Sequence, residues 1–128
     1  MAHEGILLDT VTFLDFLSGN VPGTVRRTIV ETENRFLSVI TPWEIALKRQ
    51  LRERIQPADI ATGVSDMGLR LKSVLIDHIW SLTHLPQFEE HRDPFDRLLI
   101  AQAYTHKLLL ITTDRRFSLY PHLKLLTY

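Results

Sequence analysis

Residues 93–114 read DPFDRLLIAQAYTHKLLLITTD. The segment opens with an aspartate, a proline and a second aspartate, a pattern typical of a helix start with proline in its first turn. Apolar residues then recur with helical spacing and predict a helix over 94–106 that buries one face. The run 108–112 contains only aliphatic and β-branched residues, as in a strand covered on both faces. A helix followed directly by a buried strand is typical of an α/β domain.

The same alternation extends to both ends of the chain. Strand-like runs occur at 5–8, 35–39 and 71–76, with a possible further strand at 123–127. Helical patterns occupy the segments between them: 11–17, 23–33, 42–51, 58–69 and 78–85. Strands that alternate with helices predict an α/β domain built around a mostly parallel sheet. With 128 residues, we expect a single domain over 1–128.

A second helix start is legible at Thr41-Pro42-Trp43-Glu44. Threonine at the N-cap, proline at the first helical position and glutamate at the third form a capping box. The pattern therefore predicts that Thr41 caps the helix that carries Glu44.

The composition excludes several classes of protein. Apolar residues make up 45% and charged residues 23%, which is typical of a folded globular chain. The absence of cysteine excludes a disulfide scaffold, a thiolate zinc site and a cysteine nucleophile. Fifteen basic and fifteen acidic residues cancel, so any nucleic-acid contact must come from a local patch. Neither a signal peptide nor a membrane-length apolar run is visible, so we expect a cytoplasmic location.

Four acidic residues occupy special places in the predicted fold. Asp9 and Asp114 follow apolar strands, at the carboxyl ends where open α/β sheets form their ligand crevices. Glu44 and Asp96 lie in the first turns of helices that begin at the same edge. Four carboxylates in one cleft repel each other unless cations neutralise them, and Mg²⁺ and Mn²⁺ prefer such oxygen ligands. This arrangement can support phosphodiester hydrolysis.

Each of these acids also has a purely structural interpretation. Glu44 and Asp96 can serve as capping residues that interact with the helix dipole. Asp9 and Asp114 can form turns or caps. Spacing alone leaves the structural and the metal-binding interpretations both open.

Four segments, in order and nearly end to end, resemble the PIN domain, and more narrowly the VapC-type toxin ribonucleases of bacterial toxin–antitoxin pairs. They are 6–10 (ILLDT), 42–46 (PWEIA), 91–103 (HRDPFDRLLIAQA) and 112–117 (TTDRRF). The third segment is the most specific. The resemblance implies a three-layer α/β/α fold with a central parallel sheet and an Mg²⁺- or Mn²⁺-dependent endoribonuclease.

The resemblance also implies roles for individual residues. The family's acidic quartet falls on Asp9, Glu44, Asp96 and Asp114, with Asp9 and Asp96 as the chief metal ligands. Thr10 matches a position where a small hydroxyl residue often lies beside the metal. Asp93 is interpreted first as a helix N-cap and second as an outer-shell group.

Partners are likewise implied by the resemblance: an RNA substrate, a small antitoxin protein that wraps the domain, and a homodimer. Phe13, Phe16 and Leu17 are candidates for the antitoxin groove or the dimer seam, although core burial explains them more simply. Among the basic residues near the acids, RNA phosphate contacts are expected from Arg97, Arg115 and Arg116.

The six histidines show no metalloprotease spacing, and we expect them in surface or cap positions. Two other functions stay open: a catalytically degenerate PIN-like binding module and a structure-specific DNA nuclease.

Overall fold

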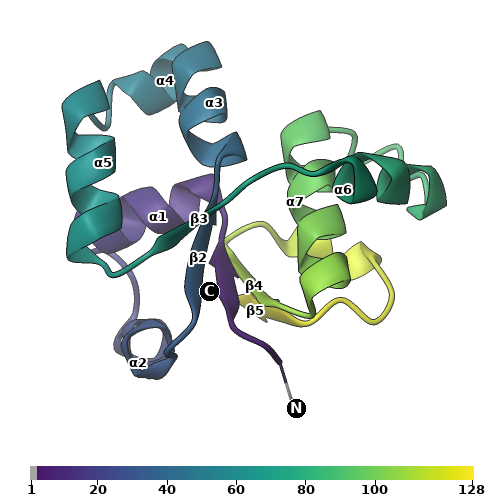
Figure 1. Cartoon of the computed structure of the whole chain (residues 1–128), viewed down its shortest axis with the longest axis horizontal. Helices are drawn as coiled ribbons and strands as arrows, with labels where there is room; N and C mark the ends of the chain where they lie inside the picture. Colours follow the sequence, from purple (N-terminus) through teal and green to yellow (C-terminus); the bar gives the residue numbers. More distant parts are fainter. Residues whose placement is uncertain (1–2) are drawn as a thin grey trace.

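The computed structural model describes residues 3–128, and its centre is a five-stranded sheet (Figure 1). The strand order is β3-β2-β1-β4-β5, and every neighbouring pair is parallel. This confirms the predicted α/β class, and the possible fifth strand is present. The strands are β1 Ile6–Leu8, β2 Arg35–Ser38, β3 Arg70–Lys72, β4 Leu109–Thr112 and β5 Leu125–Thr127.

Helices cover both faces of the sheet, which gives three layers. On one face α1, α2 and α5 pack over Ile6 and Leu8, and on the other α7 and η2 pack over Leu7. Successive side chains of a strand point to opposite faces of the sheet, so Ile6 and Leu8 face one helical layer and Leu7 faces the other. All three side chains are fully buried, because both faces are covered. The helices are α1 Thr10–Leu17, α2 Gly23–Glu31, α3 Ile40–Leu47, α4 Arg49–Arg52, α5 Pro57–Asp66, α6 Ile76–Ser81 and α7 Pro94–His106, with 3₁₀ turns η1 Leu82–His84 and η2 Arg115–Leu119.

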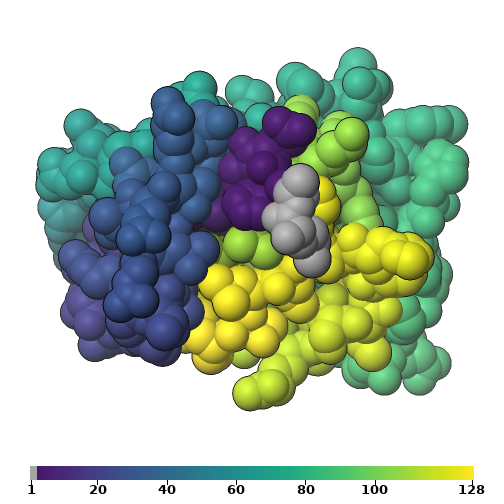
Figure 2. All heavy atoms as spheres, turned by 90° about the horizontal axis from the view of Figure 1, so that it is seen from below, coloured from purple at the N-terminus to yellow at the C-terminus, as the bar shows by residue number. Residues whose placement is uncertain are grey.

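The central strand β1 lies at a topological switch point. From β1 the chain proceeds to β2 and β3 on one side, and later places β4 and β5 on the other. Figure 2 shows the opposite, amino edge of the sheet, where the purple start of the chain lies between the blue segment leading to β2 and the yellow C-terminal segment. A switch point opens a crevice at the carboxyl ends of the two strands that flank it, here β1 and β4.

The predicted cap of α3 is wrong. The helix begins at Ile40, and the hydroxyl of Ser38 accepts the Ile40 amide at 3.1 Å. Thr41 lies inside the helix, and its hydroxyl is 3.0 Å from that of Thr10. Pro42 is still tolerated because amides of a first helical turn have no helical acceptor.

Two other boundaries also differ from the prediction. The helix expected over 42–51 is interrupted at Lys48, whose extended backbone (φ −106°, ψ 111°) separates α3 from α4. The strand expected over 71–76 is only β3, and residue 76 already begins α6. An apolar run alone does not distinguish a strand from a half-exposed helix.

Among residues 3–128, no helix has both the length and the apolar character needed to cross a membrane.

Candidate metal centre

The carboxyl edge of the sheet brings the four predicted acids into one region. Asp9 follows β1 and caps α1, and Asp114 lies just after β4 and caps η2. Glu44 is on α3 and Asp96 is in the first turn of α7, and these two helices contact each other above the sheet (Figure 1). The site thus follows directly from strand ends and helix starts that meet at the switch point.

Two groups of side chains in this region have the geometry to hold a cation. Glu44, Asp93 and Asp96 form one group, and His91, Asp96 and Asp114 form the other. Within each group, one ligand atom per residue lies within 4.8 Å of the others. Asp96 belongs to both groups. Carboxylate oxygens with a single imidazole nitrogen suit Mg²⁺ or Mn²⁺ better than a soft metal.

Asp96 carries the largest electrostatic strain at the site. Burial, and then the charges of four neighbouring carboxylates, raise its pKa to about 8. Without a cation, this carboxyl group therefore keeps its proton at neutral pH. The contributing acids are Asp93, Asp9, Glu44 and Asp114.

Asp9 lies beside these two groups and belongs to neither of them. Its Oδ1 accepts the Thr12 amide at 2.8 Å, which makes it the N-cap of α1, and its Oδ2 accepts the Thr112 hydroxyl. Burial raises the pKa of Asp9 to about 6, although these hydrogen bonds oppose the shift. Asp9 is therefore both a structural cap and a buried carboxylate near Asp96.

Glu44 is held on both of its oxygens. Oε1 accepts the Thr10 hydroxyl at 2.6 Å, and Oε2 accepts the Lys48 amine at 2.6 Å. The same amine lies 3.0 Å from Oδ2 of Asp93. Lys48 thus places a positive charge on one of the two acidic groups. The spacing of four residues between Glu44 and Lys48 is the signal in the sequence for this ion pair.

Asp93 is the N-cap of α7 and also belongs to one of the two candidate cation-binding groups. Its Oδ1 accepts the Phe95 amide at 2.8 Å, which confirms the predicted N-cap of α7. Its other oxygen faces Lys48, and hydrogen bonds from the Lys48 amine and from the backbone outweigh burial and lower the pKa of Asp93. Asp93 is therefore ionised and adjacent to the acids.

His91 is the residue that sequence reasoning missed. The expected surface or cap position is wrong for His91, which is fully buried. His78 is also fully buried, and it does take a cap role, because its Nδ1 accepts the Leu75 amide at the start of α6 at 2.9 Å. His91 Nε2 lies 3.1 Å from Asp96 Oδ2, and Nδ1 lies 3.0 Å from the Tyr120 hydroxyl. The Tyr120 hydroxyl also accepts from the Arg97 guanidinium at 3.0 Å. Hydrogen bonds therefore link Arg97, Tyr120, His91 and Asp96 in a continuous chain.

The three predicted phosphate-contacting arginines have different surroundings. Arg116 binds both oxygens of Asp114, at 2.6 Å to Oδ2, and this pairing lowers the pKa of Asp114. Arg97 donates to the Pro86 carbonyl at 2.9 Å as well as to Tyr120. Arg115 is exposed at the start of η2. Phosphate contact by these residues stays a prediction.

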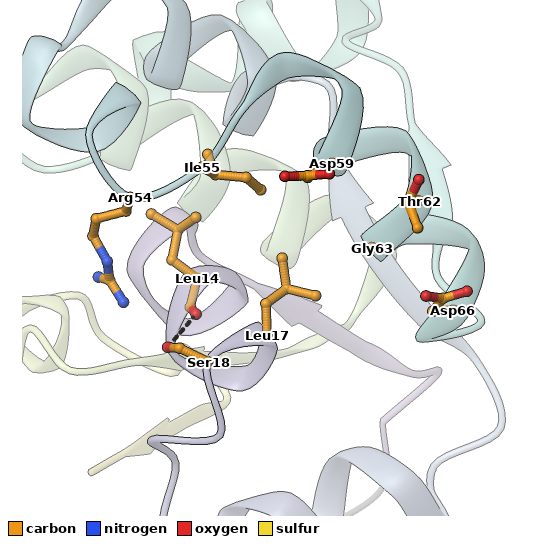
Figure 3. A pocket seen from close by; sticks show the side chains of 9 residues that line it. All are labelled: Leu14, Leu17, Ser18, Arg54, Ile55, Asp59, Thr62, Gly63 and Asp66. Carbon is orange, nitrogen blue, oxygen red and sulfur yellow. Dashed lines mark hydrogen bonds between the residues drawn. The ribbon is translucent and has the colours of Figure 1, made fainter.

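A separate groove of about 340 Å³ lies between α1 and α5. Figure 3 shows Leu14, Leu17 and Ile55 directed into it, with the carboxylates of Asp59 and Asp66 along its α5 side. Gly63 allows this close approach, because a Cβ there would lie 2.9 Å from Leu17 Cδ2. Phe13, a candidate for this surface, is instead fully buried in the core.

Comparison with known proteins identifies a family and structural neighbours. The PIN domain family matches residues 6–123. A solved chain described as a toxin–antitoxin complex from Klebsiella pneumoniae superposes with a TM-score of 0.66 at 21% sequence identity. The match covers 95% of this chain and 96% of that chain, and at this identity it shows a shared fold. No curated protein matches this sequence.

Proposed function

Because this chain belongs to the PIN domain family, a family of nucleases, we propose that it is an Mg²⁺- or Mn²⁺-dependent endoribonuclease. We further propose that it acts in the cytoplasm as a VapC-type toxin of a toxin–antitoxin pair. The observation that supports the activity most directly is Asp96, a partly buried carboxylate shared by the two candidate cation-binding groups. Burial and then the charges of the neighbouring carboxylates raise its pKa, and a bound cation would relieve that repulsion.

Asp96 and the acids grouped with it, Glu44, Asp93 and Asp114, have the geometry to fit such a metal, and Asp9 lies beside them. Asp96 and Asp9 are the proposed chief ligands, and Glu44 and Asp114 complete the shell or orient the attacking water. A divalent cation supplies Lewis-acid chemistry for phosphodiester hydrolysis when bound there. The chain's own groups hold this site in place: Thr10 positions Glu44, Thr112 positions Asp9, and His91 positions Asp96.

Cleavage of a mixed RNA pool tests the proposed activity. We expect fragments with Mn²⁺ or Mg²⁺, no fragments with EDTA, and none from the Asp96→Asn variant. Single-stranded DNA of matching sequence is tested in parallel as a second substrate. Preferred cutting of DNA would identify a DNA nuclease, and nucleic-acid binding without metal-dependent cleavage would identify a binding module.

The groove between α1 and α5 is the surface that we assign to an antitoxin. It offers apolar contacts at Leu14, Leu17 and Ile55, and the carboxylates of Asp59 and Asp66 favour a partner segment that carries a basic residue. On the other rim, Arg54 is paired with Asp15 at 2.9 Å. The structural neighbour belongs to a toxin–antitoxin complex, which supports this class of partner.

Two leucines of equal exposure allow a matched test of this surface. Leu17 in the groove is 38% exposed, and Leu119 on η2 is 37% exposed. An antitoxin should suppress RNA cleavage by the wild-type chain, bind Leu17→Ala more weakly, and bind Leu119→Ala normally. Equal suppression of both variants would place the antitoxin elsewhere. A homodimer is also part of the proposal, and solution scattering that shows only monomers at high concentration would overturn it.

A further inference from the structure

An exposed aromatic pair borders the acidic site. Trp43 on α3 and Phe95 on α7 have ring centroids 4.8 Å apart at an interplanar angle of 72°, an edge-to-face contact. Trp43 nevertheless remains 54% exposed. Tryptophan is on average one of the more buried residue types, so a ring that is held by a neighbour and still open to solvent needs an explanation.

The pair lies next to the acids in sequence and in space. Trp43 precedes Glu44, and Phe95 precedes Asp96. The Lys48 amine links the aromatic pair to the acids, because it lies 5.2 Å from the Phe95 ring centroid and is hydrogen-bonded to Glu44. One ring of the pair is therefore adjacent to the groups proposed to hold the cation.

The two rings are not equally available to a ligand. Phe95 is partly buried, and Lys48 lies over its ring as a cation–π partner. Trp43 contacts Phe95 and still exposes more than half of its surface. Trp43 thus presents the open aromatic face, and Phe95 limits how far that ring can move.

We propose that Trp43, supported by Phe95, stacks an unpaired nucleobase of the RNA substrate beside the scissile phosphate. The inference rests on the proposed ribonuclease activity and adds the chemical class of the contact. Bases of single-stranded RNA are accessible for stacking on aromatic side chains, whereas bases inside a duplex are not. Stacking on one ring tolerates any base, so this contact favours single strands rather than a particular sequence.

Tryptophan fluorescence can detect this contact directly, because the chain has only two tryptophans. Trp80 on α6 is 69% exposed and serves as the matched control. The probe is a single-stranded RNA with 2′-O-methyl sugars, which resists cleavage. The RNA is titrated into the protein in buffer that contains either EDTA or Ca²⁺. We expect the RNA to quench Trp43 fluorescence in Trp80→Phe and to leave Trp80 fluorescence unchanged in Trp43→Phe.

Affinity measurements give the second readout. Trp43→Ala should bind the RNA about 5- to 100-fold more weakly, the range for loss of one base–aromatic stack. Trp43→Phe should restore most of this loss, and Trp80→Ala should bind within about twofold of wild type. Duplex RNA should not quench Trp43. Wild-type affinity in Trp43→Ala, or no quenching of Trp43 by single-stranded RNA, would overturn the inference.

The proposed activity is judged separately, by Mn²⁺-dependent cleavage by the wild-type chain. A wild-type protein that cuts RNA while Trp43→Ala binds and cuts equally well refutes only the stacking role. A wild-type protein that binds RNA through Trp43 and never cuts it refutes only the nuclease.

Discussion

His91 and Asp96 are joined by a 3.1 Å contact between Nε2 and Oδ2, and the imidazole is completely buried. Two arrangements of protons are compatible with the hydrogen bonds that His91 makes to Asp96 and Tyr120. When Asp96 is ionised, His91 donates from Nε2 and accepts the Tyr120 proton at Nδ1. When Asp96 is protonated, it donates to Nε2, and Nδ1 donates to Tyr120. A neutral imidazole therefore supports Asp96 in both states, consistent with burial that lowers the pKa of His91.

Removal of the Tyr120 hydroxyl should weaken the metal site without changing any of the proposed carboxylate ligands. Tyr120→Phe leaves His91 Nδ1 without its partner at 3.0 Å, so the ring no longer has a fixed orientation toward Asp96. Loss of such an outer contact lowers metal affinity by about 10- to 100-fold. Calorimetric titration with Mn²⁺ measures the change. Tyr104→Phe is the control, since the Tyr104 hydroxyl binds the Pro121 carbonyl instead. Equal Mn²⁺ affinity in both variants would show that Tyr120 has no positioning role.

Asp96→Asn should stabilise the protein when no metal is present. The folded-state pKa of Asp96, about 8, lies above the unfolded value, so the folded state binds the extra proton and wild-type stability falls between about pH 4 and 8. The loss is roughly 1.4 kcal/mol per pH unit while only the folded state keeps its proton. Asparagine has no charge to develop and keeps an oxygen that can accept from His91. In EDTA, the variant should melt close to wild type near pH 4 and increasingly above wild type as the pH rises toward 9. A lower melting temperature at pH 9 together with normal RNA cleavage would make Asp96 a helix cap only.

Added Mn²⁺ should reverse the order of stability at neutral pH. A ligand stabilises only the state that binds it, by about 2.7 kcal/mol at a concentration 100 times its dissociation constant. Wild type should therefore gain more than Asp96→Asn or Glu44→Gln, because a neutral amide is a poor ligand for a hard cation. Thermal melts over a Mn²⁺ series give the comparison. Parallel shifts in all three proteins would mean that the cation binds elsewhere.

Lys48→Met should be destabilising mainly in the metal-free protein. Glu44 is only 7% exposed, and loss of the amine leaves one of its oxygens without a partner, at a cost of about 1–3 kcal/mol. A divalent cation can replace the lost charge, so Mn²⁺ should raise the melting temperature of Lys48→Met more than that of wild type.

The control for Lys48 is its neighbour Arg49. Its guanidinium faces Glu53 at 3.6 Å, both side chains are largely exposed, and such pairs contribute little. Arg49→Met should melt close to wild type with or without Mn²⁺. A similar response of the two variants to Mn²⁺ would show that Lys48 has no special relation to the cation site.

Local patterns in the sequence determined most of the architecture. Strict alternation of apolar strands with amphipathic helices specifies an α/β sheet, because strand runs covered on both faces need helical layers. The start of α7 was equally legible, since Asp93 caps amides only two and three residues away. The positions of Asp9, Asp96 and Asp114 near one edge follow from the same local reasoning, because strand ends and helix starts meet there. The expected first-turn position of Glu44 is wrong, since α3 begins at Ile40 and its first turn holds no acidic residue.

Tertiary structure decided the features that depend on contacts between distant segments. Thr41 does not cap α3, because the helix begins one residue earlier, at Ile40, and the Thr41 hydroxyl lies 3.0 Å from that of Thr10, 31 residues away. His91 looks like a surface residue in sequence, and in the fold its ring is buried against the rings of Phe117 and Tyr120, which lie far from it in the chain. Lys48 likewise reaches Asp93 across 45 residues. Hydrogen bonds and charge pairs act over a few ångströms in space, and sequence spacing predicts that distance only within one helix or strand.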